Sequence, residues 1–308
     1  MEHLSVLYEE SLQGLNIRSD GYYIDCTFGR GGHSKGVLER LGKAGKLLAF
    51  DRDLAAVNSV YADEMREDQR FALHHGCFSE LEAVVTQQGW HGKVDGVLMD
   101  LGVSSPQLDD SQRGFSFLRD GPLDMRMDHS QGISAAEWLA QVEEKVLVKV
   151  LFEYGEERFA RRIAKAIMER RLEAPLKTTF DLAKLIANTI PKKEKHKHPA
   201  TRSFQAIRIE INNELGEIKQ GLQQAVNVLK PGGRLVVISF HSLEDRIVKR
   251  FIRSESGRKF NPGRLPIKEA DIEQGILKSV GKAIKADKQE LQKNPRARSA
   301  VMRVAERV

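Results

Sequence analysis

The chain has 308 residues, of which 41% are hydrophobic and 25 are glycine, and its net charge is +6. This length predicts about two domains, or one domain with a large insertion. No apolar run is long enough to cross a bilayer, and the N-terminus has no signal-peptide pattern. Two cysteines without framework spacing favour a reducing cytosol. The positive charge favours a polyanionic partner such as nucleic acid, although a solvated basic surface explains it equally well.

Four short apolar runs that end in turn or acidic residues predict β-strands. These runs are Tyr22–Thr27, Lys46–Asp51, Phe71–His74 and Val94–Asp100. Helical patterns lie between them, at Ser34–Leu41, Asp53–Met65 and Ser79–Gln88. Because strands and helices alternate, we expect a parallel sheet covered by helices on both faces.

A fifth apolar strand, Gly233–Phe240, follows only after a connection too long for a simple crossover. We therefore predict an inserted helical domain over residues 106–205, within a sheet domain formed by residues 1–105 and 206–308. Helical patterns in the insertion cover Ser134–Leu139, Val146–Tyr154, Glu157–Arg171 and a segment from Thr178, where Asp181 completes a capping box. The charged stretch 191–198 predicts an exposed loop.

The segment after the fifth strand predicts a helix capped by Ser242 and then an antiparallel hairpin. Glu244 and Asp245 in the first turn of this helix suit the helix dipole. Two alternating stretches, Ile276–Ile284 and Arg298–Val304, are expected to pair in the hairpin. A parallel sheet with such a hairpin is more typical of methyltransferases than of dehydrogenases.

The stretch from Asp25 to His33 carries the strongest functional signal. It is a strand running into the turn Gly29-Arg30-Gly31-Gly32, and the next strand ends in Asp51. This order is typical of sites for adenosine-containing cofactors, where the acid binds ribose hydroxyls. The spacing differs from that of dinucleotide sites, because Ser34 stands where the third glycine belongs. This favours S-adenosylmethionine, which has no pyrophosphate, and makes a nicotinamide-dependent dehydrogenase the weaker hypothesis.

Three further residues are candidates for the same site. Phe78 follows the third strand and either contacts an adenine or packs in the core. Asp100 ends the fourth strand, where it can hold the cofactor, accept a hydrogen bond from a substrate amine, or only cap the strand. Gln107 lies in the loop that follows. No metal site is predicted, because His74-His75 and His196-Lys197-His198 lack cysteine or carboxylate partners at metal spacing.

Specific motifs run in order along nearly the whole chain. They are Asp25–Ser34, Phe50–Asp53, Met99–Asp109, Arg113–Phe117, Gly121–Met127, Tyr154–Arg158, His198–Arg202, Phe204–Ile209, Ser239–Asp245 and Asn294–Ser299. Together they resemble the bacterial RsmH (MraW) family, which are S-adenosylmethionine-dependent 16S ribosomal RNA cytosine-N4 methyltransferases. The resemblance implies the class I Rossmann-like methyltransferase fold.

The resemblance also implies the site and its substrate. Its cofactor shell would be Gly31, Gly32, His33, Asp51, Phe78, Asp100 and Gln107. The substrate would be the N4 amine of a cytidine, position 1402, in the decoding region of the small ribosomal subunit. The insertion would help to recognise RNA, the enzyme would act in the cytoplasm, and a homodimer is expected. An alternative is a non-catalytic RNA-binding protein of ribosome assembly.

The chain differs from other amino-methyltransferases in the motif that binds the substrate amine. Many of them carry Asp/Asn-Pro-Pro-aromatic after the fourth strand, whereas this chain reads Asp100-Leu101-Gly102-Val103. We expect Asp100 to border this site, where it either fixes the cofactor or faces the amine. Trp138 is the candidate platform for a base that leaves its stack, the alternative being a helix-core tryptophan. Basic residues of the insertion are candidates for phosphate contacts or for a plain solvated face: Arg161, Arg162, Lys165, Arg170, Arg171, Lys197 and Arg202.

Overall fold

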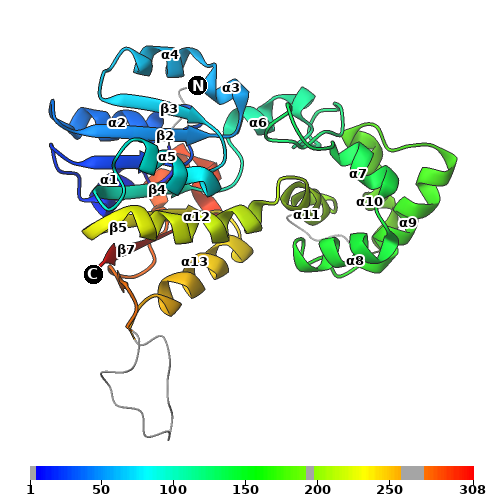
Figure 1. Ribbon diagram of the computed structural model, residues 1–308. Helices are drawn as coiled ribbons and strands as arrows, with labels where there is room; N and C mark the ends of the chain where they lie inside the picture. Colours follow the sequence, from blue (N-terminus) through cyan, green and yellow to red (C-terminus); the bar gives the residue numbers. More distant parts are fainter. Residues whose placement is uncertain (1–4, 192–197, 258–273) are drawn as a thin grey trace, which may run out of the picture. The chain divides into compact units, whose positions relative to one another are not determined.

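A computed structural model describes residues 5–191, 198–257 and 274–308 (Figure 1). The chain divides into two compact units. The sheet unit comprises Met1–Gly102 and Leu215–Val308, and the helical unit comprises Val103–Glu214. Within the described ranges, no helix is long and apolar enough to span a membrane.

A seven-stranded sheet with the order β3-β2-β1-β4-β5-β7-β6 forms the centre of the sheet unit. Its strands are β1 (Tyr22–Asp25), β2 (Lys46–Asp51), β3 (Phe71–His75), β4 (Val94–Asp100), β5 (Leu229–Ser239), β6 (Leu277–Ser279) and β7 (Val301–Arg307). The first five strands are parallel, whereas β7 pairs antiparallel with both β5 and β6. The predicted α/β fold and its terminal antiparallel pair are thereby confirmed.

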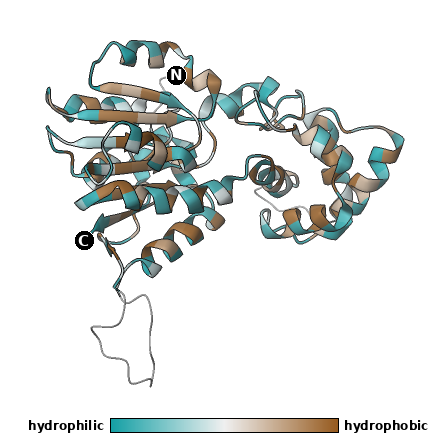
Figure 2. Cartoon of the chain, viewed as in Figure 1, coloured by the Kyte–Doolittle hydropathy of each residue, from teal (hydrophilic) through white to brown (hydrophobic). Residues whose placement is uncertain are grey.

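Helices cover both faces of this sheet, because its strands are apolar on both sides. The helices are α1 (Tyr8–Leu15), α2 (Gly32–Arg40), α3 (Leu54–Val57), α4 (Val60–Arg66), α5 (Leu81–Gln87), α12 (Glu214–Val228), α13 (Ser242–Ser254) and α14 (Lys288–Lys293). Ile24 and Leu48 belong to a buried cluster with residues of α5, α12 and α13. Their neighbours Tyr23 and Leu47 belong to a second cluster, with residues of α1 and α2. Figure 2 shows the resulting hydrophobic colour along the central strands.

Two predicted helices differ from the structure, one in its middle and one at its start. The expected helix Asp53–Met65 is interrupted, because the Ser59 side chain accepts the Ala62 amide and starts a new helix, α4. The prediction that Ser242 caps α13 is wrong. The cap is His241, whose backbone is extended, and Ser242 is already helical. The expected loop at 191–198 lies mostly outside the described residues.

The helical unit has its own core. Its elements are α6 (Ser105–Asp109), α7 (Ala135–Gln141), α8 (Glu144–Glu153), α9 (Ala160–Glu173), α10 (Thr179–Thr189) and α11 (Thr201–Ile211). Side chains from α7 to α11, such as Leu139, Ile163 and Phe204, form one buried cluster. The capping box at the start of α10, between Thr178 and Asp181, is confirmed.

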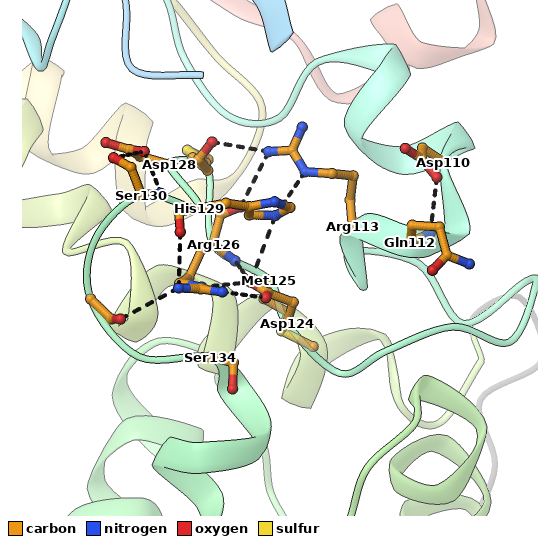
Figure 3. A network of polar contacts seen from close by, with 12 residues as sticks. Asp110, Gln112, Arg113, Asp124, Met125, Arg126, Asp128, His129, Ser130 and Ser134 are labelled. Atoms are coloured by element: carbon orange, nitrogen blue, oxygen red, sulfur yellow. Dashed lines mark hydrogen bonds and ion pairs between the residues drawn. The ribbon is translucent and has the colours of Figure 1, made fainter. Parts of the chain in front are cut away.

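A polar network holds the long loop between α6 and α7 (Figure 3). The buried Arg113 guanidinium donates to the carbonyl oxygens of Arg126 and Met127, at 3.2 and 2.9 Å, and to His129 Nε2 at 3.1 Å. Met125, which directly precedes these acceptors in the chain, is fully buried at a φ of 65°, a strained value for a residue with a side chain. This loop therefore keeps its path through buried hydrogen bonds rather than through regular secondary structure.

We expect Arg113→Met to loosen this loop, because the substitution keeps the apolar stem and removes the buried donors. Unpaired buried carbonyls cost about 1–3 kcal/mol each, so the loop should open more readily. Hydrogen exchange at residues 124–129 measures this opening. Arg119→Met, at an exposed position of the same loop, is the control. Equal exchange in both variants would contradict the network's role.

Candidate functional site

Three acidic residues mark the carboxyl edge of the sheet. Asp25 ends β1, Asp51 ends β2 and Asp100 ends β4. Since these strands are parallel and adjacent, their ends meet at one edge. The chain leaves β1 toward β2 on one side and reaches β4 on the other, which makes this the switch point where doubly wound sheets bind ligands.

The predicted glycine turn lies at this edge between β1 and α2. Gly29 and Gly31 have positive φ values of 55° and 73°, which glycine adopts without strain. A Cβ at Gly31 would lie 2.8 Å from Met65 Sδ and 3.0 Å from the Phe28 ring, so a side chain there would have to displace these neighbours. Gly32 begins α2, so the turn leads directly into the N-terminus of this helix. The turn thus brings bare backbone to the site.

The Asp25 carboxylate fixes the turn from beneath. It is 1% exposed, and its Oδ1 accepts the Thr27 amide at 3.0 Å. Its Oδ2 accepts the Ser34 hydroxyl of α2 at 2.7 Å. Both oxygens therefore bind the turn that a ligand would rest on.

Asp51 connects the end of β2 to the same turn. Its Oδ2 accepts the Gly29 amide at 2.7 Å, and its Oδ1 accepts the Asp53 amide at 2.8 Å. Burial raises the pKa of Asp51 to about 6, although these two backbone hydrogen bonds oppose the rise. Each carboxylate oxygen can accept a further hydrogen bond, so the geometry suits ribose hydroxyls.

Asp100 has a carboxyl oxygen that forms no hydrogen bond within the described residues. Its amide donates to Thr27 Oγ1 at 2.7 Å, which joins β4 to the turn. The side chain is 25% exposed, but Oδ1 is buried and has no hydrogen-bond partner among the described residues. Burial, reinforced by the charges of Asp25 and Glu244, raises the pKa of Asp100 well above its usual value. A buried, unpaired carboxyl oxygen of this kind calls for a donor from a ligand.

The His33 ring packs against neighbouring residues of the protein. Its Nε2 lies 3.2 Å from the Val6 carbonyl oxygen, and the ring stacks on Tyr8. Its Nδ1 lies 3.9 Å from Asp100 Oδ2. The ring nitrogens of His33 thus face the Val6 carbonyl group on one side and the Asp100 carboxyl group on the other.

Phe78 lies in the turn after β3, at the same edge as Asp51. It is partly buried and packs against the cluster that includes α12. Gly221 of α12 makes room for it, because a Cβ there would overlap the Phe78 ring. The ring therefore has a fixed position from which it can contact an adenine.

The remaining predicted site residues lie in the helical unit. Gln107 is 5% exposed, and its Oε1 accepts the Ser104 amide at 2.9 Å in the capping box of α6. Trp138 is partly buried against the core of the helical unit. The Arg202 guanidinium donates to the Glu156 carbonyl oxygen at 3.1 Å. The structure brings together Gly31, Gly32, His33, Asp51, Phe78 and Asp100 in the sheet unit.

Two acidic residues near this edge were missed as site residues by the sequence reasoning. Glu244 is fully buried, and its Oε2 accepts the amides of Phe240 and His241 after β5. Glu217, on α12, has a buried Oε2. The capping-box spacing of His241 and Glu244 was a readable signal. No local signal marked Glu217, because its surroundings come from distant parts of the chain.

Comparison with known proteins assigns the family. A family model described as the MraW methylase family matches residues 1–308. The chain belongs to this family. A relative from Methylococcus capsulatus, named ribosomal RNA small subunit methyltransferase H, is 58% identical over 302 residues, covering 98% of this chain and 99% of its own. A relative of the same name from Pseudoalteromonas atlantica is 56% identical over 307 residues, covering 99% and 98%.

Membership of this family confirms the resemblance drawn from the motifs. It also confirms the predicted enzyme class, a methyltransferase that uses S-adenosylmethionine. The residues of the sheet unit fit this cofactor. The turn at Gly31 lets a ligand approach the backbone closely, and the acceptors of Asp51 suit the ribose hydroxyls.

We expect cofactor binding to weaken below about pH 6, because protonation of Asp51 removes acceptors for the ribose hydroxyls. The dissociation constant of S-adenosylhomocysteine should rise by up to about tenfold per pH unit there. Calorimetric titration from pH 5 to 8 measures it. In Asp51→Asn, binding should be weak and nearly independent of pH. A wild-type affinity that stays constant across this range would refute the assignment.

The same pKa predicts how the ligand-free protein's stability changes with pH. The folded pKa of about 6 lies above the value of an unfolded aspartate, so the folded state binds the proton more tightly. The contribution of Asp51 to the free energy of unfolding should therefore fall as the pH rises from about 4 to about 6.

Proposed function

We propose that this protein transfers a methyl group from S-adenosylmethionine to the N4 amine of a cytidine in 16S ribosomal RNA. The observation that carries the proposal is the buried, unpaired Oδ1 of Asp100 at the switch point, beside the glycine turn. The names of the relatives support the RNA substrate.

Asp100 would act on the amine directly. The lone pair of cytosine N4 is delocalised into the ring, so the amine is a poor nucleophile. S-adenosylmethionine supplies a strongly electrophilic methyl group. Asp100 Oδ1 would accept an N4–H, hold the amine in line, and remove its proton as positive charge develops on nitrogen. The raised pKa makes Asp100 a stronger base than an ordinary carboxylate.

The helical unit would supply the RNA contacts. Arg170 and Arg171 donate to carbonyl oxygens within the unit, at 2.7 Å to Ala174 and at 2.7 Å to Val142. Arg161 and Arg162 of α9 are exposed and are therefore the better phosphate candidates. Trp138 stays our candidate platform for the flipped base, and Lys197 lies outside the described residues.

Several aspects of the cellular setting follow from this proposal. The substrate RNA would be presented in the small ribosomal subunit, and the enzyme would work in the cytoplasm. A homodimer remains a prediction. Incubation with labelled S-adenosylmethionine and small subunits, with free RNA alongside, tests the proposal once the labelled nucleotide is mapped. Cofactor binding without any labelled nucleotide would support the non-catalytic assembly protein instead.

We expect Asp100→Asn to reduce kcat by at least about a hundredfold, because the amide can no longer take the proton. The affinity for S-adenosylhomocysteine should change much less. Asp63→Asn, on the exposed surface of α4, is the matched control. If Asp100→Asn turned over like the control, Asp100 would not be the base.

Replacing both Arg161 and Arg162 by alanine should weaken RNA binding and reduce its salt dependence. Each lost phosphate contact lowers the slope of log affinity against log salt by about 0.7–0.9. Arg40→Ala, at a partly exposed position in the sheet unit, serves as control. An unchanged slope would place the RNA elsewhere.

A further inference from the structure

One face of α12 follows the segment Cys77–Glu82, which comes directly after β3. The Gln224 side chain bonds to two backbone groups of this segment, one of them the Glu82 amide at 2.9 Å. One turn earlier, Gly221 leaves the space that the Phe78 ring fills. The helix thus fixes this segment at several points along its length.

Glu217 lies one turn before Gly221, on the same face of α12. Burial raises the pKa of the Cys77 thiol to about 11; nearby Arg52 opposes the rise, and a hydrogen bond between Cys77 and Glu217 adds to it. Glu217 Oε2 is also buried, yet it has no hydrogen-bond partner in the described part of the chain. An unsatisfied buried carboxylate oxygen is costly, so its retention points to a donor that comes from outside the protein.

The topology places Glu217 at the carboxyl edge of the sheet. The end of α12 leads directly into β5, which runs parallel to β4. The first turns of α12 therefore lie where the parallel strands end. Cys77 comes two residues after β3, so Glu217 and its thiol partner share this edge with Asp51 and Phe78.

We infer that the Glu217 carboxylate accepts a hydrogen bond from the 6-amino group of the cofactor's adenine. A carboxylate oxygen only accepts hydrogen bonds, so the ligand must bring an N–H or O–H. With the ribose held at Asp51 and the base against Phe78, the exocyclic amine is the donor that the base presents. A hypoxanthine base carries a carbonyl oxygen there instead, which the carboxylate repels. The inference rests on the proposed cofactor site, and it makes Glu217 a determinant of base specificity.

Calorimetric titration with S-adenosylhomocysteine and S-inosylhomocysteine tests this assignment without any catalytic turnover. Wild-type protein should bind the adenosyl ligand about 10–100-fold more tightly, because the inosyl ligand lacks the donor. Glu217→Gln should bind the adenosyl ligand about tenfold more weakly. It should also lose most of the discrimination, since an amide can donate to the carbonyl oxygen.

Glu64→Gln, an exposed glutamate on α4, is the matched control and should behave as wild type. Equal affinity of wild-type protein for both ligands would overturn the inference without any variant. Unchanged discrimination in a folded Glu217→Gln protein would overturn it as well. Failure of wild-type protein to bind S-adenosylhomocysteine at all would reject the proposed cofactor site itself, which separates the two failures.

Discussion

The buried carboxylate of Asp25 joins the elements that form the cofactor site. Through Thr27 and Ser34 it ties the end of β1 to the start of α2. The Thr27 hydroxyl also accepts a hydrogen bond from the Asp100 amide, so the same turn positions the end of β4. Because hydrogen bonds to an ionised group are stronger than neutral ones, one carboxylate can set the relative positions of three elements.

Negative charge accumulates around that carboxylate. Burial raises the pKa of both Asp51 and Asp100, and the charge of Asp25 contributes in each case. Such an edge is unfavourable for an empty protein and favourable for a ligand that brings hydroxyl donors and a positively charged sulfur. Part of the cofactor affinity should therefore come from hydrogen-bond donors that satisfy carboxyl groups which folding has already removed from water.

Local patterns in the sequence predicted the strands and the acids that end them. Apolar runs are short-range signals that can be recognised without knowing the tertiary structure. An acidic residue that ends such a run lies at the edge of the sheet, as Asp51 and Asp100 do. The predicted cap of α13 is wrong by one residue, because serine is a much commoner cap than histidine and only the spacing from His241 to Glu244 pointed to the true cap. The neighbourhood of Glu217 was not predictable, since it meets Cys77 only after α12 folds onto a distant segment.

The order of elements along the chain affects how the protein can fold during synthesis. The helical unit, about 110 residues long, separates β4 from its partner β5. At typical rates of about 5–20 residues per second, its synthesis takes about 6–22 seconds. Throughout that interval one edge of the apolar β4 lacks its neighbour, and α12 is absent from the cluster it will cover. A nascent chain of this design is exposed to strand-edge aggregation until residue 239 has left the ribosome.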